Sequence, residues 1–523
     1  MAGYQGVVVP IPVAVDGGYG TQKIPLSGLR RFRGITLENN QLEKEGGATS
    51  QNATALVVGS QGIVAQFDWW PDAATQRHIA VGGNGAVFRD AGTWTFPTTV
   101  IAAGTLTIAN QPPHLIDGGF ETPGRNRKLF LMTGTDAVRV GSGDFTTMSV
   151  VANPPADWTG AQQPLCGVIH QGRFWGAVGH TVYYSSLTDH EDFRSASGGG
   201  SIPIAPGVGF GIRCLKSIRG ILVILKYPRG IYLLDTSNVT ATNWRYDTQS
   251  NAVGTGGPYG AIEVPNDLLI VNSDLSLHLL SATNVLRDAA SSDISSPKLG
   301  TWIRDNLNAN RSAWAHAVWY SDKRQVWIGA AATGSVVNDR RVLVDFNRPD
   351  VGPRFTYSER DTQQSLVMRL LNGVERPYLG DDTGLVMKLD ETARSKNGAG
   401  YMGQAQIDHL DLGEAEPSFT DRVKNFDFLD LETLAVWAYN LSINIYIDGV
   451  LVTPTPLTIS LAGAGAVLGS FVLDVDRLAE AVTARTRTFL PWSGVRISVE
   501  LFNSGIDETF QVPRMFIGAR VAE

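Results

Sequence analysis

The chain has 523 residues, of which 43% are hydrophobic and 18% are charged, and its formal net charge is −7. This composition is typical of a folded globular protein and excludes a largely disordered chain. The acidic balance disfavours a free nucleic-acid-binding protein, which is usually basic, and no apolar run approaches the roughly 20 residues of a membrane-spanning helix.

Residues 1–50 are predicted to form an N-terminal arm. The strand-like run at residues 6–15 contains Pro10 and Pro12, which suit an edge strand because proline has no backbone N–H to donate. No Lys or Arg precedes this run, so we expect a chain made and kept in the cytoplasm rather than one led by a signal peptide. Because terminal strands commonly complete the last blade of a propeller, the arm is also expected to supply a ring-closing strand.

A repeated unit follows the arm. Each copy has a short apolar strand, a turn rich in Gly, Asp or Asn, and a second strand that often carries Tyr, Phe or Leu. The anchors Ile79, Leu129, Phe174, Ile221, Leu268, Val326 and Pro377 are spaced by 50, 45, 47, 47, 58 and 51 residues. Blades of a β-propeller recur at this period, so residues 51–395 are predicted to form a propeller of six or seven blades.

The interval of 58 residues is attributed to an inserted helix. Ser296 and Pro297 are typical of an N-cap and a first helical residue. The following residues KLGTWIRDNLNA would then form about three turns with Trp302 and Leu307 facing inward.

Residues 402–523 are predicted to form a C-terminal antiparallel β-sandwich. Apolar and polar residues alternate along two strands, which is typical of sheets with one face in water. The apolar positions are Ile443, Ile445 and Ile447 in one strand and Val495, Ile497, Val499 and Leu501 in the other. A short helix is expected from about Asp476. The fold class is therefore all-β.

Motifs of nucleotide and metalloprotease sites are missing from the sequence. His190, Glu191 and Asp192 are consecutive, so their side chains would point in different directions and are not expected to share a metal. Cys166 and His170 have the same strand parity, but nothing supplies the orienting group that a Cys–His nucleophile needs. Burial of Cys166 and Cys214 as two thiols is favoured over a disulfide between them.

Two acidic motifs also favour structural interpretations. FRDAGTWTF around Asp90 is one residue short of a sialidase Asp-box and occurs once, so it is interpreted as a hairpin with Trp94 packed on the blade. Asp381, Asp382 and Gly384 fit a hairpin turn better than a glycosidase carboxylate pair. We therefore expect no catalytic, cofactor-binding or metal-binding residue, and no cofactor.

A carbohydrate-binding or carbohydrate-cleaving propeller is the alternative function. It would need carboxylates or aromatic platforms on the innermost strands of the blades. The strands interpreted as innermost read HIAVGG, LFLMTG, FWGAVG, ILVILK, LLIVN and VWIGA, and their apolar character disfavours an axial polar site. A general protein-interaction propeller is a third alternative.

Eight residues are candidates for a protein interface. Six are basic and two are aromatic: Arg30, Arg31, Arg33, Arg125, Arg127 and Lys128, with Trp69 and Trp70. Solvated basic residues and an ordinary blade core for the two tryptophans remain the alternatives.

Several segments resemble the β-propeller hub, nozzle or DNA-stabilisation proteins of short-tailed (podovirus-type) phages. The resemblance covers about residues 20–395 and lies in PLSGLRRFRGITLENNQLEKEGGA, FDWWPDAATQRHIAVGGNGAVFRDAGTW, HQGRFWGAVGHTVYYSSLTDHEDF, YPRGIYLLD and YLGDDTGLVMKLDE. It rests on patterning rather than on catalytic residues. The turn at Gly46 and Gly47 departs from relatives, which often have a basic residue and Pro before the Gly.

The resemblance implies a structural virion protein of the tail, assembled in the host cytoplasm. Its subunits would form a homo-oligomeric ring, expected to be a hexamer, below the portal and head–tail adaptor proteins, and tail fibres or distal tail parts would attach to it. The bore of the ring would conduct or retain DNA without binding it specifically. An acidic chain agrees with this role, because each Lys or Arg contact to phosphate adds affinity.

Overall fold

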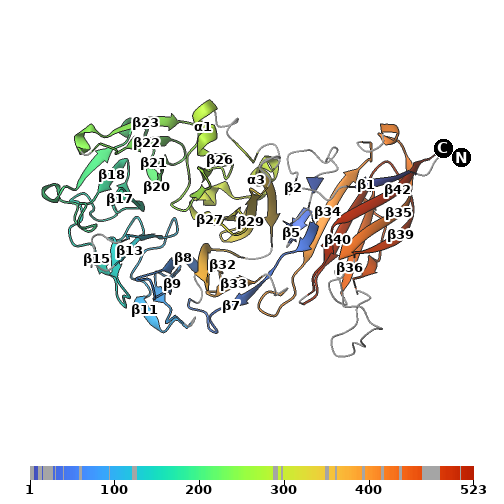
Figure 1. The fold of residues 1–523 in the computed structure, drawn as a ribbon, viewed down its shortest axis with the longest axis horizontal. Coiled ribbons are helices and arrows are strands. Elements are labelled where there is room, and N and C mark those ends of the chain that lie inside the picture. Colours follow the sequence, from blue (N-terminus) through green and yellow to red (C-terminus); the bar gives the residue numbers. More distant parts are fainter. Residues whose placement is uncertain are drawn as a thin grey trace.

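The fold was analysed in a computed structural model of the whole chain. The structure describes residues 5–9, 14–15, 28–29, 31–33, 35–38, 41–57, 62–92, 95–119, 127–238, 240–286, 293–295, 299–347, 353–359, 362–390, 395–413, 417–434, 439–461, 483–506 and 508–522. A propeller and a β-sandwich lie side by side along the long axis of the molecule (Figure 1). None of the helices in the described part of the chain is long and apolar enough to cross a membrane.

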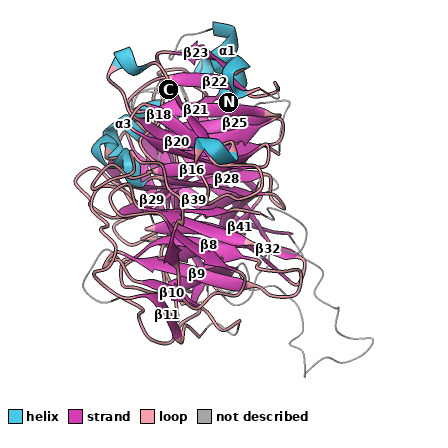
Figure 2. Ribbon diagram, turned by 90° about the vertical axis from the view of Figure 1, so that its left-hand side faces the viewer, coloured by secondary structure: helices cyan, strands magenta, loops and turns pink. Residues whose placement is uncertain are grey.

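Seven antiparallel sheets form the blades of the propeller, and Figure 2 shows how far strands dominate the chain. From the innermost to the outermost strand, blades 1 to 4 are β8 (Ile63–Trp69), β9 (Arg77–Gly82), β10 (Val87–Arg89) and β11 (Thr98–Ile101); β12 (His114–Asp117), β13 (Lys128–Met132), β14 (Arg139–Ser142) and β15 (Ser149–Val150); β16 (Cys166–His170), β17 (Arg173–Val178), β18 (Thr181–Tyr184) and β19 (Gly200–Pro203); and β20 (Ile212–Ile218), β21 (Ile221–Lys226), β22 (Ile231–Asp235) and β23 (Arg245–Ser250). Blades 5 to 7 are β24 (Ala261–Val264), β25 (Asp267–Val271) and β26 (Leu277–Leu279); β27 (His316–Tyr320), β28 (Gln325–Ala331), β29 (Asn338–Asp345) and β30 (Arg354–Ser358); and β31 (Ser365–Leu371), β32 (Val374–Gly380), β33 (Val386–Asp390) and β7 (Gly47–Ser50).

The ring of blades is closed twice. Each innermost strand contacts the innermost strand of the next blade, and β31 of blade 7 contacts β8 of blade 1. In addition, β7 from the N-terminal arm pairs antiparallel with β33 and is the outermost strand of blade 7. Segments more than 300 residues apart in sequence therefore share one sheet, which removes the free ends that an open propeller would have.

The repeat seen in the sequence corresponds to the second strand of every blade. All seven anchors, from Ile79 in β9 to Pro377 in β32, lie on second strands, so the propeller has seven blades. The interpretation of HIAVGG, LFLMTG and their equivalents as innermost strands is wrong. A second strand pairs on both sides and is buried on both faces, so it gives the strongest apolar signal in each blade.

Blade 5 departs from the four-stranded pattern. It has three strands in the described part of the chain, and α1 (Leu280–Leu286) follows its third strand and packs against β25. The inserted helix is α3 (Gly300–Asn306), with Trp302 buried, while Leu307 is buried just beyond its end. Ser296 and Pro297 lie outside the described residues. Five short 3₁₀ helices lie in loops: Ser195–Ser197, Pro206–Val208, Ala241–Asn243, Ala309–Trp314 and Pro417–Phe419.

The sandwich contains both ends of the chain. One sheet has the order β1 (Gln5–Val9), β42 (Arg514–Val521), β35 (Lys424–Leu434) and β39 (Thr483–Gly494). The other has the order β37 (Val450–Leu451), β36 (Asn440–Ile447), β40 (Ile497–Asn503), β34 (Gly403–Leu410) and β4 (Arg31–Arg33), and β38 (Leu457–Ser460) also pairs with β36. Smaller sheets join β41 (Gln511–Val512), β6 (Gln41–Lys44) and β5 (Ile35–Glu38), and β2 (Ala14–Val15) with β3 (Gly28–Leu29).

The predicted alternation holds in β36, where Ile443, Ile445 and Ile447 are buried. It fails in β40, because the polar positions Ser498 and Glu500 are buried as well. Side chains on neighbouring strands cover Glu500 and donate hydrogen bonds to its carboxylate. The helix expected from about Asp476 lies outside the described residues.

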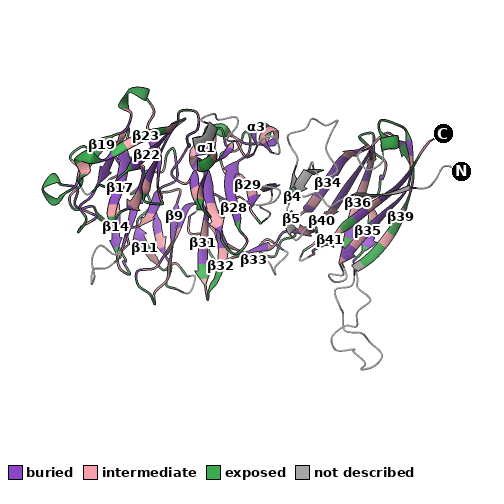
Figure 3. Cartoon of the chain, turned by 45° about the horizontal axis from the view of Figure 1, so that its top comes forward, coloured by how far each residue is buried: buried purple, intermediate pink, exposed green. Residues whose placement is uncertain are grey.

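Propeller and sandwich share one hydrophobic core. A single cluster of buried side chains runs from blades 5 and 6 through Ile35 and Leu42 of the arm to the facing sheets of the sandwich, and buried residues are continuous across both parts in Figure 3. The chain crosses between the two parts twice, at residues 44–47 and 390–403. The two parts therefore form one packed body.

Candidate functional site

The innermost strands of the blades carry polar and charged residues, in contrast to the sequence interpretation. They include Asp68, His114, Asp117, His170, Lys216, Glu263, His316 and Arg369. The axis must therefore be considered as a place for chemistry, and the side chains at its two ends decide what it can do.

Tyr259 crosses the propeller axis at the end where the innermost strands begin. It precedes β24 of blade 5, and its hydroxyl donates a hydrogen bond of 3.0 Å to the carbonyl oxygen of Pro113 next to blade 2. The same hydroxyl accepts a 3.1 Å hydrogen bond from the N–H of Leu115. Burial raises the pKa of Tyr259, so the hydroxyl remains protonated.

Two histidine rings flank Tyr259. Its ring stacks on His316 of blade 6 with centroids 4.5 Å apart and meets the edge of His114 of blade 2 at 5.1 Å. Burial lowers the pKa of His114 to about 3 and that of His316 to about 4, so both rings are neutral near pH 7. Neutral rings pack here without a buried charge.

Trp314 fills the remaining space at this end. It is buried among apolar side chains of blades 1 and 2 although it belongs to the segment that leads into blade 6. Asn338 donates a 2.7 Å hydrogen bond to its carbonyl oxygen. With Tyr259 and Trp314 in place, side chains occupy the axis where many propellers have an open channel.

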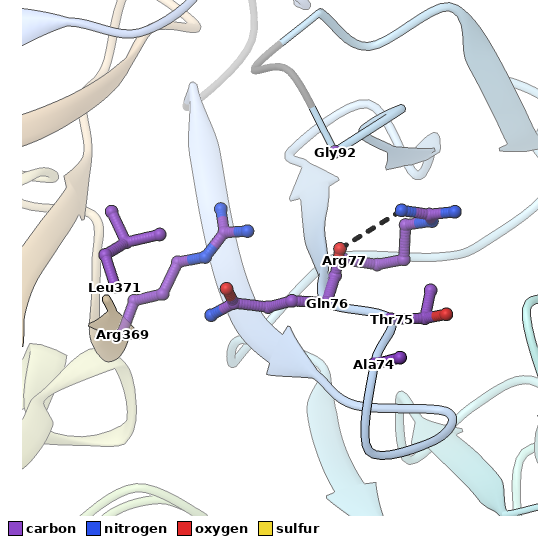
Figure 4. A pocket seen from close by; sticks show the side chains of 7 residues that line it. All are labelled: Ala74, Thr75, Gln76, Arg77, Gly92, Arg369 and Leu371. Atoms are coloured by element: carbon purple, nitrogen blue, oxygen red, sulfur yellow. Dashed lines mark hydrogen bonds between the residues drawn. The ribbon is translucent and has the colours of Figure 1, made fainter. Parts of the chain in front are cut away.

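A polar pocket lies at the opposite end, on the seam between blades 7 and 1. Its volume is about 310 Å³, and it is lined by Ala74, Thr75, Gln76, Arg77, Gly92, Arg369 and Leu371. Figure 4 shows Arg369 and Gln76 extending from blades 7 and 1 toward the same space. Arg369 is buried, with its Nε 3.1 Å from an oxygen of Asp68 and its Nη1 3.7 Å from an oxygen of Asp90.

The two carboxylates of this seam are held as part of the ring closure. Burial is the main cause that raises the pKa of both Asp68 and Asp90, and the Arg369 charge opposes it. Gln76 donates hydrogen bonds of 2.9 Å to both oxygens of Asp68 and one of 2.8 Å to the carbonyl of Leu370 in blade 7. An acid–base pair for hydrolysis needs carboxyls that reach a substrate, whereas these carboxyls are occupied by groups of the chain itself.

A second layer of polar contacts strengthens the seam. Gln66 of blade 1 donates a 2.9 Å hydrogen bond to the hydroxyl of Ser365 in blade 7. The Nε2 of His78 lies 2.8 Å from the Gln66 side-chain oxygen, and the His78 backbone N–H donates to Asp90 at 2.7 Å. Burial and the nearby Arg369 charge hold the pKa of His78 well below its usual value.

The tryptophans proposed for an interface lie differently. Trp69 is buried in the core between blades 1 and 2 and donates a 3.1 Å hydrogen bond to the Gly143 carbonyl, so its interpretation as an exposed anchor is wrong. Trp70 is half-buried and donates a 3.0 Å hydrogen bond to Asp68. Alternation along β8 explains Trp69, because this residue ends a strand whose inward positions are apolar.

Arg127 and Lys128 connect blades to one another. Arg127 forms an ion pair with Asp117 and donates a 3.1 Å hydrogen bond to the Trp70 carbonyl. Lys128 lies 2.8 Å from Glu191 of blade 3 and is largely buried. Both residues are satisfied within the chain, so neither is a free contact for a partner.

The remaining basic candidates belong to other parts of the chain. Arg33 is exposed on β4 at the edge of the sandwich, and Arg31 is on the same strand. Arg30 and Arg125 lie outside the described residues. The eight candidates therefore do not form one surface.

The residues considered for chemistry in the sequence have structural contacts. Cys166 and Cys214 are buried free thiols, as predicted, and burial raises the pKa of both. Asp381 accepts hydrogen bonds from the N–H groups of Thr383 and Leu385 in the turn before β33, which confirms the hairpin interpretation. In the part of the chain that the structure describes, no three His, Cys, Asp or Glu side chains gather as a metal site. Trp94 lies outside that part.

The sequence did not indicate the importance of Tyr259 or Arg369. Tyr259 lies in the loop GGPYG, where a lone aromatic among glycines could have indicated a close approach of other chain segments. Arg369 is the single charge in the strand SLVMRLL. A charge at such a position predicts a buried partner, but the partner is 301 residues away in sequence, at Asp68.

Comparisons with known proteins give no identity for the chain. No family model matches it, and no curated protein matches it. Among solved structures it is similar to the computationally designed Ika8 protein (10% identity, TM-score 0.36, 64% of this chain and 98% of that chain), to Chaetomium thermophilum Raptor (11%, 0.42, 67% and 29%) and to YCF48 bound to D1 peptide (9%, 0.38, 64% and 94%). The assignment of seven blades rests on the strand order and ring closure of the chain itself.

Proposed function

We propose that the chain is a structural subunit of a phage tail, a hub or nozzle protein whose copies form a ring below the portal and adaptor. DNA would pass through the bore between subunits, not along the axis of one propeller. The filled axis at Tyr259 is therefore compatible with the proposal.

The observation that carries the proposal is the junction between propeller and sandwich. Lys44 is fully buried there, and its ammonium donates a 3.0 Å hydrogen bond to Asn503 of the sandwich. The next residue, Glu45, forms an ion pair with the buried Arg341 of blade 6. Tyr401, on the return crossing, has its ring 4.4 Å from the Lys44 ammonium.

Such a junction fixes the orientation of the two parts. Buried charges keep their partners only in one geometry, because an unpaired buried charge is costly. A ring subunit benefits from a fixed angle between its parts, since small errors accumulate around a closed ring. An enzyme that opens and closes on a substrate would instead be expected to have a hinge between its domains.

Sandwich side chains offer surfaces for contact between subunits. Phe489 on β39 is 77% exposed, and Val450 on β37 is 66% exposed. Because blade strands are already paired, we expect subunit contacts to come from the sandwich and from loops.

Native mass spectrometry and negative-stain microscopy of the purified chain test the proposal. We expect a ring of six subunits, or of two stacked sixes. Phe489→Ser should weaken the ring, whereas Leu187→Ser, which changes an exposed apolar residue of the propeller, should leave it intact. A chain that stays monomeric at high concentration and cleaves glycans would contradict the proposal.

Carbohydrate binding is the second candidate function, and one observation favours it. A cavity opens beside the propeller axis at the end where the innermost strands begin. Cleavage is not favoured, because the buried carboxylates Asp68 and Asp90 lie at the opposite end and are engaged by Arg369.

A further inference from the structure

The cavity beside the axis lies between blades 2, 3 and 4. Its volume is about 510 Å³, within the usual range of small-molecule sites. It is formed by loops that lead into β16 and β20 and by the turns after β13 and β17: Gly134, Asp157, Ala161, Gln162, Gln163, Leu165, Ala177, Val178, Gly179, Thr181, Tyr183, Gly211, Ile212 and Arg213.

Arg213 supplies a positive charge to this cavity. Its guanidinium is oriented by a 3.4 Å hydrogen bond to the Gln111 side-chain oxygen and by the ring of Tyr227, whose centroid is 5.7 Å away. No carboxylate of the described residues forms an ion pair with it. This distinguishes Arg213 from Arg77, Arg127 and Arg369, each of which is paired with an aspartate.

Hydroxyl-recognising groups line the rest of the cavity. Tyr183 donates a 3.0 Å hydrogen bond to the exposed Asp157, and burial raises the pKa of Tyr183 to about 12, so it stays protonated. Gln163 is buried and donates a 3.0 Å hydrogen bond to the carbonyl of Trp158, which holds the loop that carries Asp157 and Gln162. The Gln162 side chain is exposed at the cavity.

The donor and acceptor set selects among anionic ligands. Phosphate oxygens mainly accept hydrogen bonds, so the Asp157 carboxylate would repel them. Sugar hydroxyls both donate and accept, which matches a cavity that offers a carboxylate, an amide, a phenol and a threonine hydroxyl. Arg213 adds bidentate recognition of a carboxylate. Small residues such as Gly134, Gly179 and Ala177 leave room for a ring.

We propose that this cavity binds an acidic saccharide, with Arg213 holding the carboxylate and Asp157, Gln162 and Thr181 contacting the hydroxyls. The site is independent of ring assembly, because its residues lie on the propeller and none belongs to the sandwich.

Calorimetric titration of the full chain with trigalacturonate, with maltotriose as the neutral probe, tests the proposal. We expect trigalacturonate to bind and maltotriose to bind at least about tenfold more weakly. Arg213→Gln should lower the affinity for trigalacturonate about tenfold or more, because a charge-assisted hydrogen bond is lost. Arg304→Gln is the matched control, since Arg304 is 73% exposed on its side chain and lies on α3.

Other outcomes would overturn the proposal. They are equal binding of maltotriose and trigalacturonate, tighter binding of a triglutamate peptide, unchanged affinity in Arg213→Gln, and no binding at about 10 mM saccharide. Gln162→Ala is a second variant at an exposed position and should weaken binding severalfold without affecting folding. Native mass measured on the same samples separates loss of the ring from loss of saccharide binding.

Discussion

The Tyr259 hydroxyl donates a hydrogen bond to the Pro113 carbonyl at 3.0 Å, although the two residues are 146 positions apart and belong to opposite sides of the ring. Blade 5 and blade 2 thus touch at the centre, where contacts between adjacent blades cannot reach. A central bond of this kind ties the ring across its diameter as well as around its circumference.

Replacement of Tyr259 by Phe tests this tie. The change leaves the N–H of Leu115 and the carbonyl of Pro113 buried without their partner. We expect the free energy of unfolding to fall by about 1–3 kcal/mol, measured by urea denaturation. The control is Tyr439→Phe, because the Tyr439 hydroxyl has no hydrogen-bond partner among the described residues. Equal stability of the two variants would contradict a role for the central bond.

Gly62 tests the seam where the ring closes. Its φ is +67°, and a Cβ at this position would lie 1.9 Å from the Asp381 carbonyl oxygen of blade 7. We expect Gly62→Ala to lower the free energy of unfolding by about 2–4 kcal/mol, from backbone strain and from displacement of blade 7.

Gly104→Ala is the matched control for the seam. Its φ is +77°, and a Cβ there would meet nothing within 4 Å, so only the strain of about 1 kcal/mol is expected. Urea denaturation of both variants measures the difference. If Gly104→Ala is as destabilised as Gly62→Ala, the close contact between blades 1 and 7 is not important.

The fold could be predicted from the sequence because second strands repeat. A strand buried on both faces is apolar throughout, so seven such strands were visible at a period near 47 residues. The innermost strands were not visible, since their exposed edge and mixed faces give no continuous apolar run. The axial residues Tyr259 and Trp314 lie in loops, and only the closed ring brings them to the centre.

The candidate sites were harder to predict for a related reason. Arg369, Asp68 and Gln66 belong to one network, but local sequence does not pair residues about 300 positions apart. Trp69 and Arg127 looked exposed in sequence because a neighbouring blade, which local patterns do not reveal, covers them.

Acid should destabilise the propeller through its buried histidines. The ring nitrogens of His170 lie 2.7 Å from the hydroxyls of Ser217 and Thr236, and burial lowers the pKa of His170 from 6.5 to about 4. The unfolded chain binds a proton at this residue below pH 6.5, whereas the folded chain does so only near pH 4. Stability is therefore present above pH 6.5 and is lost as the pH falls toward 4.

His170→Gln should make this pH dependence less steep. We expect the stability lost between pH 6.5 and pH 4 to be smaller in the variant by on the order of 2 kcal/mol, measured by urea denaturation at a series of pH values. Ser217→Ala is the control, because it removes a partner of the ring but keeps the imidazole, so the slope should persist. An unchanged slope in His170→Gln would show that other groups cause the acid sensitivity.

Glu45 tests the rigid junction on which the proposed function depends. Its carboxylate pairs with Arg341, whose side chain is 2% exposed. Glu45→Gln removes the negative charge and leaves the guanidinium buried, so we expect the free energy of unfolding to fall by about 2–4 kcal/mol. Limited proteolysis should also cleave the variant faster at residues 390–403, where the chain returns to the sandwich. Glu263→Gln, at an exposed position on β24, is the control and should change neither measurement. A variant with normal stability and normal resistance to protease would mean that the shared hydrophobic core alone fixes the two parts, and that the ion pair does not.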